Sequence, residues 1–305
     1  MGSDAHLIVV GGPDGLIDDA CRRVDELERR WSRFLDDSEV QVLNRRAGTF
    51  VEVSPETVTL VERAVDAWRL SGGAFDPTVL GAVIRAGYDR SFEHLGSTVP
   101  AGRSPLGLGA AGITVEGRRV RLPAGTGFDP GGIGKGLAAD LICAETMASG
   151  AEAVCVNLGG DVRVAGTGPG GGGGWTVAVE HPWSAGPVAL LGLADGAVAT
   201  STTLLRHWQS GEEHRHHLID PQTGQPCDSD ISLAAVVAGQ AWMAEVLAKA
   251  VLLAGSAHPF DIVGGTGAEA LIVDDAGRLV ATDGLAAFLD GVALPARILS
   301  PAITS

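Results

Sequence analysis

The chain has 305 residues, a length that suits one large domain or two modest ones and allows a sizeable buried core. It carries 22 Lys and Arg against 37 Asp and Glu, and the resulting formal net charge of −15 disfavours a nucleic-acid partner because no basic run offsets it. No apolar run approaches the roughly 18 residues of a membrane-spanning helix, so we expect no membrane span.

The chain is expected to begin with a strand rather than a targeting segment. Residues 6–10 form a short apolar run that predicts a β-strand. No basic segment followed by a long apolar stretch is present, so we see no signal peptide or lipobox and expect a cytoplasmic protein. The four cysteines show no CxxC spacing, which argues against a zinc site or a disulfide framework and favours buried free thiols.

Helices are predicted in four places. Apolar residues recur at helical spacing over residues 14–34, with charged residues on the other face. A second helix begins after Ser54, a capping residue followed directly by proline, and ends at the glycine pair 72–73. A glycine-rich turn leads into a third helix that ends at Gly150, and a fourth covers about residues 240–253.

Short strands are predicted in most of the remaining chain, with few long helices between them, which favours an antiparallel sheet. The predicted fold class is therefore α+β, one compact unit over residues 1–305 with two lobes and mainly antiparallel sheets flanked by helices. Residues 166–174 are rich in glycine and predict a flexible loop. The predicted strand segments are 97–126 in short pieces, 153–166, 175–182, 188–194, 197–202, 231–239 and the hairpin 270–282.

A glycine-rich turn at residues 131–136 precedes the third helix, where backbone amides and the helix N-terminus favour a bound phosphate. It is not a P-loop, because Asp129 stands where a glycine is required and Gly136 follows Lys135 in place of Ser or Thr. A dinucleotide fingerprint is also disfavoured, since the segment before the turn makes a poor central strand. The turn either binds phosphate, with Lys135 adding a point charge, or only lets the helix pack closely.

A histidine-rich segment at residues 214–217 precedes Asp220 and a predicted turn at residues 221–224. A histidine beside an aspartate and a sharp turn is a candidate general base, although a structural role is the alternative for an isolated histidine. Side chains alternate along a strand, so His216 and His217 do not both face one site if the strand is regular.

Glu245 and Lys249 stand four residues apart on the fourth predicted helix, in the order that favours an ion pair. A surface salt bridge would explain this spacing, but the helix is apolar on nearly all sides. We therefore expect the pair to be partly buried and to belong to a functional site.

Six motifs follow one another along the chain: GGAFDPT (72–78), DPGGIGKGLAAD (129–140), NLGGD (157–161), ATST (199–202), HHLIDPQTGQP (216–226) and AEVLAKAVLLAG (244–255). Together and in this order they resemble the ApbE family of FAD:protein FMN transferases. The resemblance implies a two-lobed α+β fold related to the T-fold. It also implies that FAD is the substrate, that its FMN part passes to a Thr or Ser of a flavin-acceptor protein with release of AMP, and that Mg²⁺ neutralises the two phosphates.

The resemblance also implies roles for individual residues. Phe34 would lie near the isoalloxazine ring, and Ala74, Phe75 and Asp76 would lie along the flavin nucleotide. His217 would be the catalytic base. The full set expected to bind FAD is Phe34, Ala74, Phe75, Asp76, Asp129, Lys135, Ser201, Thr202, His217 and Lys249, and the set expected at the metal site is Gly132, Glu245 and Ala248.

The chain departs from the family where Glu245 and Lys249 replace the usual Asp and Thr metal ligands. A longer carboxylate and a protonated lysine do not suit Mg²⁺, so we expect the Lys249 ammonium, held by Glu245, to supply part of the cation's charge. Thr203 also replaces the usual glycine, which predicts a stiffer loop. Such a site would bind FAD without Mg²⁺ and transfer FMN slowly or not at all. The alternatives are a non-catalytic FAD-binding protein and an FAD pyrophosphatase in which water replaces the acceptor hydroxyl.

Overall fold

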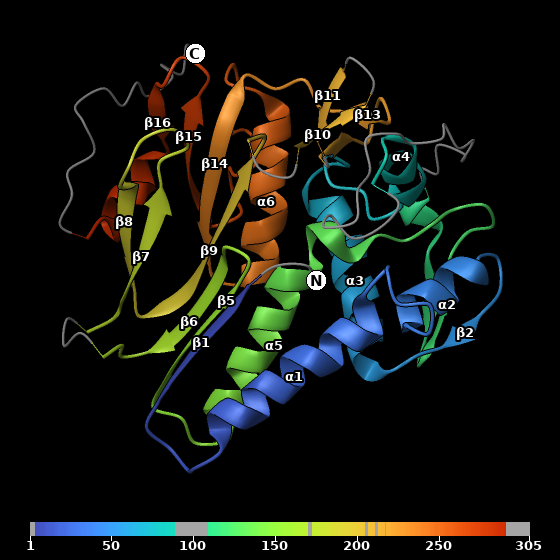
Figure 1. Cartoon of the computed structure of the whole chain (residues 1–305), viewed down its shortest axis with the longest axis horizontal. Helices are drawn as coiled ribbons and strands as arrows, with labels where there is room; N and C mark the ends of the chain where they lie inside the picture. The colour runs from blue at the N-terminus through green and yellow to red at the C-terminus, as the bar shows by residue number, and fades with distance from the viewer. Residues whose placement is uncertain are drawn as a thin grey trace. The chain divides into compact units, whose positions relative to one another are not determined.

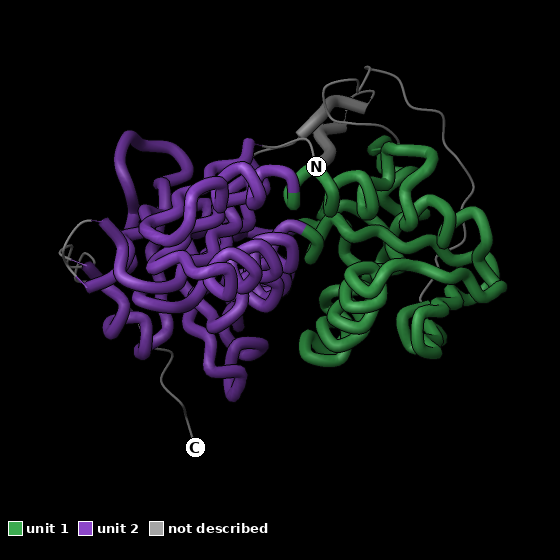
Figure 2. The backbone as a smooth tube through the Cα atoms, turned by 90° about the horizontal axis from the view of Figure 1, so that it is seen from below, with its two compact units in different colours: residues 1–3, 23–134, 205–228 green, residues 4–22, 135–204, 229–305 purple. Residues whose placement is uncertain are grey.

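The computed structural model describes residues 4–88, 109–169, 173–204, 207–210, 213–216 and 218–290. The chain divides into two compact units, each assembled from separate segments (Figure 2). Helix α1 (Leu16–Trp31) begins in unit 2 and ends in unit 1. Unit 1 comprises residues 1–3, 23–134 and 205–228, and unit 2 comprises residues 4–22, 135–204 and 229–305.

Unit 2 is built on a seven-stranded sheet in which every neighbouring pair of strands is antiparallel (Figure 1). In spatial order its strands are β1 (Ala5–Val10), β5 (Ala153–Leu158), β6 (Asp161–Gly166), β9 (Asp195–Thr202), β14 (Ile231–Ala238), β15 (Glu269–Asp274) and β16 (Leu279–Ala281). β14 is buried at all its positions. Burial of both faces explains why its sequence is apolar throughout instead of alternating.

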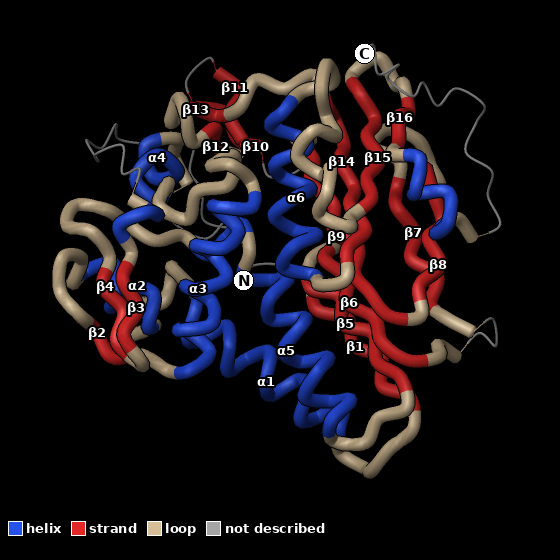
Figure 3. Tube along the Cα trace, turned by 180° about the vertical axis from the view of Figure 1, so that it is seen from behind, coloured by secondary structure: helices blue, strands red, loops and turns tan. Residues whose placement is uncertain are grey.

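Two helices cover one face of this sheet (Figure 3). Helix α6 (Ala241–Ala254) packs on β6, β9 and β14, and helix α5 (Gly134–Ala148) lies beside it. Most of the α6 side chains are buried, so the helix needs the nearly uniform apolar sequence from which it was predicted.

A hairpin covers the other face of the sheet. Its strands β7 (Trp175–Glu180) and β8 (Pro187–Leu193) share a hydrophobic core with the 3₁₀ segment η4 (Asp283–Phe288). Leu233 and Val237 of β14 belong to the same core. Ala235 belongs to this core as well, and because successive side chains of a strand point to opposite faces, Ala234 and Val236 face the helix layer.

Unit 1 combines short helices with small antiparallel sheets. Helix α3 (Pro55–Leu70) packs on the three-stranded sheet through strand β4 (Arg119–Arg121) and on the 3₁₀ segment η2 (Ala110–Gly112). Besides the end of α1, the elements of unit 1 are α2 (Glu39–Arg45), β2 (Val51–Glu52), α3 (Pro55–Leu70), α4 (Leu80–Arg85), η2 (Ala110–Gly112), β3 (Thr114–Glu116), β4 (Arg119–Arg121), η3 (Pro130–Gly132), β10 (His207–Ser210), β11 (Glu213–His216), β12 (Ile219–Asp220) and β13 (Gln225–Pro226).

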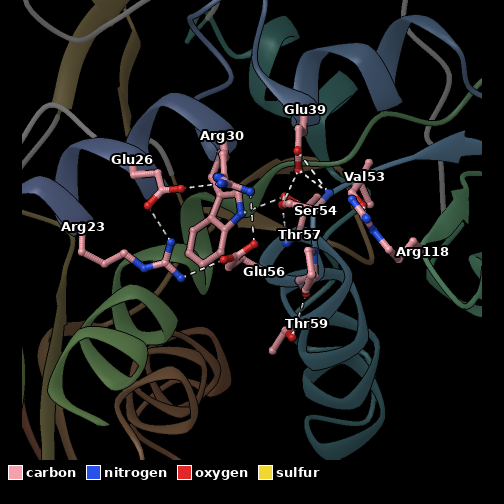
Figure 4. Close-up of polar contacts among 12 residues, drawn as sticks. Arg23, Glu26, Arg30, Glu39, Val53, Ser54, Glu56, Thr57, Thr59 and Arg118 are labelled. Atoms are coloured by element: carbon pink, nitrogen blue, oxygen red, sulfur yellow. Dashed lines mark hydrogen bonds and ion pairs between the residues drawn. The ribbon is translucent and has the colours of Figure 1, made fainter. Parts of the chain in front are cut away.

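The start of α3 is fixed by the cap that its sequence predicts. The Ser54 hydroxyl accepts the backbone N–H of Thr57 at 3.3 Å and donates to the carboxylate of Glu39 at 2.7 Å (Figure 4). Glu56, in the first turn, accepts hydrogen bonds from Arg23 at 2.8 Å and Arg30 at 3.1 Å on α1. These bonds tie α1 to α3 within unit 1.

The predicted α+β class with antiparallel sheets is confirmed, as are the hairpin between β15 and β16 and the reversal between β12 and β13. The helix predicted over 14–34 ends earlier, at Trp31, and the short helix α2 has no counterpart in the prediction. The four cysteines are free thiols, but only Cys143 is buried; Cys155 and Cys227 are partly exposed and Cys21 is exposed, contrary to the expectation of buried thiols. In the predicted loop 166–174, Gly166 ends β6 and residues 170–172 lie outside the described residues.

No helix within the described residues has both the length and the apolar character needed to cross a membrane.

Candidate functional site

Four charged side chains meet in unit 2 to form what we call the lysine–carboxylate cluster: Lys135, Asp161, Glu245 and Lys249. Lys135 Nζ donates to Glu245 Oε1 at 2.8 Å and also to the carboxylate of Asp161. Lys249 Nζ donates to the same Glu245 oxygen at 3.0 Å. The Glu245 side chain is 1% exposed and that of Asp161 3%, so both carboxylates are buried and paired with ammonium groups.

Three elements position the cluster. Lys135 lies in the first turn of α5, Asp161 opens β6, and Glu245 and Lys249 lie one turn apart on α6. The start of α6 is held by Asp140 of α5, which accepts the backbone N–H groups of the first two α6 residues at 2.8 and 3.0 Å. This cap and the pairing of Glu245 with Lys135 join the two helices at the same end.

Gly136 permits the close approach of α5 to α6. Its backbone N–H donates to Glu245 Oε2 at 2.9 Å, and a Cβ placed on it would lie 2.4 Å from the carbonyl oxygen of Ala241. That oxygen belongs to the backbone, so no side-chain rotation relieves the clash. The requirement for glycine here is therefore steric, and it belongs to the helix–helix contact.

We expect Gly136→Ala to lower the free energy of unfolding by about 1–3 kcal/mol, because the α6 backbone would have to shift. Gly134→Ala is the matched control, since a Cβ there meets only a Pro130 side-chain atom at 3.4 Å. It should be neutral or stabilise by about 0.5–1 kcal/mol. Urea unfolding followed by tryptophan fluorescence measures both, and equal effects of the two changes would contradict the steric explanation.

The cluster shifts the ionisation of its own members. Burial opposes the ionised form of Glu245, but the ammonium charges of Lys135 and Lys249 outweigh it and hold the Glu245 pKa at about 2. Burial raises the pKa of Asp161 to about 6, despite the opposing charge of Lys135. Burial disfavours the charged form of Lys135, but the two carboxylates raise its pKa above the ordinary value. Lys135 therefore serves as a fixed positive charge at neutral pH.

The Mg²⁺ that the resemblance implies does not fit Glu245 as placed. Its Oε1 accepts from two ammonium groups and its Oε2 accepts the Gly136 N–H, so both oxygens already have partners. Ala248 is fully buried within α6, and Gly132 belongs to unit 1. Among the described residues no three His, Cys, Asp or Glu side chains form a group able to hold a metal. Glu245 in this arrangement has no oxygen free to ligate Mg²⁺.

Unit 1 brings together two of the segments that the sequence assigns to the flavin. The backbone N–H of Asp129 donates to the carbonyl of Pro77 at 2.8 Å, which joins the DPGG turn to the GGAFDPT segment. Asp76 is buried and accepts the Thr78 N–H at 2.7 Å, and burial raises the Asp76 pKa. Phe75 is also buried, and Ala74 before it is partly exposed.

Phe34 lies close to these segments through its neighbour in the chain. The guanidinium carbon of Arg33 lies 4.3 Å from the centroid of the Phe34 ring, and Arg33 Nε lies 3.7 Å from the Asp129 carboxylate. Asp129 in turn accepts the backbone N–H of Gly131 at 2.8 Å. Unit 1 thus gathers Phe34, the 74–76 segment and Asp129, which lie far apart in the sequence.

Ser201 and Thr202 do not share a face of the sheet, although both were expected to bind FAD. Val198 of β9 points into the hairpin core, so Ser201 points to the helix side and Thr202 to the hairpin side. The Thr202 hydroxyl donates to the carbonyl of Ser232 at 2.7 Å. Only the Ser201 side chain faces the same side of the sheet as Asp161.

His217, the predicted base, lies outside the described residues. Three other residues, Asp161, Asp140 and Arg33, make contacts in the structure that the sequence did not predict. Asp161 and Asp140 are the last residues of the motifs NLGGD and DPGGIGKGLAAD, and this position could have identified them as candidates. Arg33 directly precedes Phe34 and had no such signal.

The fold and the cluster define a class: α+β proteins with an antiparallel sheet, a glycine turn before α5 and buried charges where α5 meets α6. Residues 1–272 match the model of the ApbE family, and the chain belongs to that family.

Relatives with assigned names are similar over most of the chain. An FAD:protein FMN transferase of Rhodobacter capsulatus is 30% identical over 276 residues, which cover 88% of this chain and 52% of the relative. An FAD:protein FMN transferase of Treponema pallidum (strain Nichols) is 30% identical over 248 residues, which cover 72% of this chain and 66% of the relative. The chain thus spans about half the length of the first relative and 66% of the second.

Solved structures show the same fold. The ApbE protein of Thermotoga maritima superposes with a TM-score of 0.84 at 26% identity, covering 94% of this chain and 96% of that one. The flavin transferase ApbE of Vibrio cholerae superposes with a TM-score of 0.79 at 24% identity, covering 95% and 96%.

Proposed function

We propose that this chain is an FAD:protein FMN transferase that acts without Mg²⁺ at Glu245. The observation that carries the proposal is the family match over residues 1–272. The relatives named as FAD:protein FMN transferases support the substrate. The lysine–carboxylate cluster supports the altered metal dependence.

The proposed reaction is a displacement at phosphorus. The hydroxyl oxygen of a Thr or Ser in the acceptor protein bonds to the phosphorus of the FMN part of FAD. The bond between that phosphorus and the oxygen shared with the AMP phosphate breaks, and AMP leaves with the shared oxygen. The hydroxyl proton passes to a base, for which His217 is the candidate by resemblance. Alignment of the hydroxyl opposite the leaving oxygen accounts for much of the rate.

Lys135 and Lys249 are the proposed source of positive charge near the two phosphates. Each ammonium has three N–H donors, and the bonds to Asp161 and Glu245 orient them. The two carboxylates cancel the two lysine charges formally, so the cluster as a whole supplies less charge than a site loaded with a divalent ion. We therefore expect weaker stabilisation of the developing phosphate charge and slow transfer.

A non-catalytic FAD-binding protein is the second candidate. The observation that favours it is that both Glu245 oxygens accept hydrogen bonds from N–H donors, which leaves neither oxygen free to ligate a metal. An FAD pyrophosphatase is the third, with water in place of the acceptor hydroxyl. The three candidates predict different products.

Incubation of the purified protein with FAD, followed by measurement of AMP, separates them. We expect slow AMP release that changes little between Mg²⁺ and EDTA, and flavin attached to a Thr- or Ser-containing acceptor peptide when one is added. FAD binding without AMP release would establish the non-catalytic candidate. AMP release with free FMN, unchanged by the peptide, would establish the hydrolase. AMP release that depends steeply on Mg²⁺ would contradict the proposal that Lys249 supplies part of the positive charge near the phosphates.

A further inference from the structure

We propose that Arg33 is a flavin-binding residue whose Nη2 donates a hydrogen bond to a carbonyl oxygen of the isoalloxazine ring. The inference rests on the proposed function and adds a residue that the sequence motifs do not assign. Arg33 follows the last residue of α1 by two positions, and its side chain is 8% exposed. Among the described residues, its Nη2 is the only buried side-chain nitrogen or oxygen without a hydrogen-bond partner.

The other atoms of the guanidinium are held in place. Nη1 donates to the backbone carbonyl of Tyr88 at 2.8 Å, and Nε lies 3.7 Å from the carboxylate of Asp129. The backbone carbonyl of Arg33 accepts from the Gln41 side chain at 2.7 Å. A charged group so restrained does not rotate freely to reach another acceptor. Leaving a buried charged donor unpaired costs free energy, which a ligand oxygen in the right place would recover.

Aromatic rings determine what kind of ligand suits this donor. The guanidinium carbon lies 4.3 Å from the ring centroids of both Phe34 and Tyr88, and those centroids are 5.8 Å apart. The separation is well below twice 4.3 Å, so the rings do not lie on opposite sides of the guanidinium. Both rings are partly exposed, and rotamer changes of such side chains are common when a ligand binds.

The charge balance favours a carbonyl over a phosphate as the acceptor. Asp129 already offsets part of the Arg33 charge, and its carboxylate would repel a phosphate brought to the same guanidinium. A flat aromatic ligand with carbonyl oxygens in its plane matches the surrounding rings and the in-plane N–H groups of arginine. Phe34, adjacent in the chain, is the residue expected beside the isoalloxazine ring.

The test compares Arg33→Met and Arg33→Lys with wild type for riboflavin, FAD and ADP. Arg30→Met is the matched control, because Arg30 also lies at the end of α1 but pairs with Glu26 and Glu56 (Figure 4). Quenching of flavin fluorescence gives the riboflavin and FAD affinities, and calorimetry gives that for ADP. Both Arg33 variants should bind riboflavin and FAD about 10- to 100-fold more weakly, with ADP and the control unchanged.

Two results would contradict the role proposed for Arg33. Unchanged riboflavin and FAD affinities in a folded Arg33→Lys protein would overturn the inference, and so would a loss confined to ADP and FAD, which would place Arg33 at a phosphate. Arg33→Lys keeps the positive charge, so it remains informative if Arg33→Met fails to fold. Failure of the wild type to bind any flavin would instead overturn the proposed function, and the two failures are therefore distinguishable.

Discussion

Replacing Glu245 by Asp and Lys249 by Thr together should make FAD binding and AMP release depend on Mg²⁺. The change removes one of the two ammonium groups that donate to Glu245 Oε1, shortens the carboxylate and introduces a hydroxyl oxygen one turn further along α6. Divalent charge at the phosphates would stabilise the reaction more than an ammonium does, so AMP release should rise at least about tenfold with Mg²⁺ over EDTA. Titration of AMP release and FAD affinity against Mg²⁺ measures the effect.

Lys249→Arg is the matched control for this experiment. Arginine keeps a permanent positive charge beside Glu245, so the single variant should remain insensitive to Mg²⁺, as we expect of the wild type. If the double variant is equally insensitive, the hypothesis that Lys249 takes the place of the cation's charge fails. A wild type that already responds steeply to Mg²⁺ would lead to the same conclusion.

Glu245→Gln should lower the free energy of unfolding by about 3–5 kcal/mol at pH 7, because it leaves the two largely buried ammonium groups of Lys135 and Lys249 with one carboxylate, that of Asp161. The folded-state pKa of Glu245, about 2, lies below its ordinary 4.5. The unfolded chain therefore binds a proton first as the pH falls, and the stabilisation by ionised Glu245 is complete above about pH 4.5 and is lost toward pH 2. The difference between wild type and variant should shrink over that interval.

Urea unfolding at pH 7 and at several values down to pH 3 measures this dependence. Glu116→Gln is the control, because Glu116 pairs with Arg119 at an exposed position and its loss should cost under about 1 kcal/mol at any pH. A Glu245→Gln effect as small as that of the control would mean that the buried pairs contribute little net stability. An effect that grows as the pH falls would contradict the ionisation assigned to Glu245.

Much of the fold was predictable because it depends on local rules. Ser54 caps α3 as its sequence indicates, and residues 275–277 make the turn between β15 and β16. Helix α2 was missed because seven residues contain too few turns for a periodic pattern. The first helix was predicted to extend to residue 34 because apolar residues continue at helical spacing there, although the helix itself ends at Trp31.

The candidate site was predictable in its parts and not in its contacts. The spacing of Glu245 and Lys249 indicated their ion pair, which the structure contains at 3.0 Å. Lys135 was expected to contact FAD, and in the structure it pairs with Asp161 and Glu245. Alternation along β9 likewise separates Ser201 from Thr202, although their motif placed them together.

The sequence by itself determined the family, the order of the four long helices and the ion pair within α6, since each depends on residues that are neighbours along the chain or on motifs in a known order. Only the tertiary structure decided that Glu245 is shared by Lys135, Lys249 and the Gly136 N–H, and that Arg33 keeps an unpaired buried donor. The physical reason is that pairing and desolvation of a charge depend on packing between segments about 110 residues apart, as for Lys135 and Glu245, and no local pattern encodes that distance.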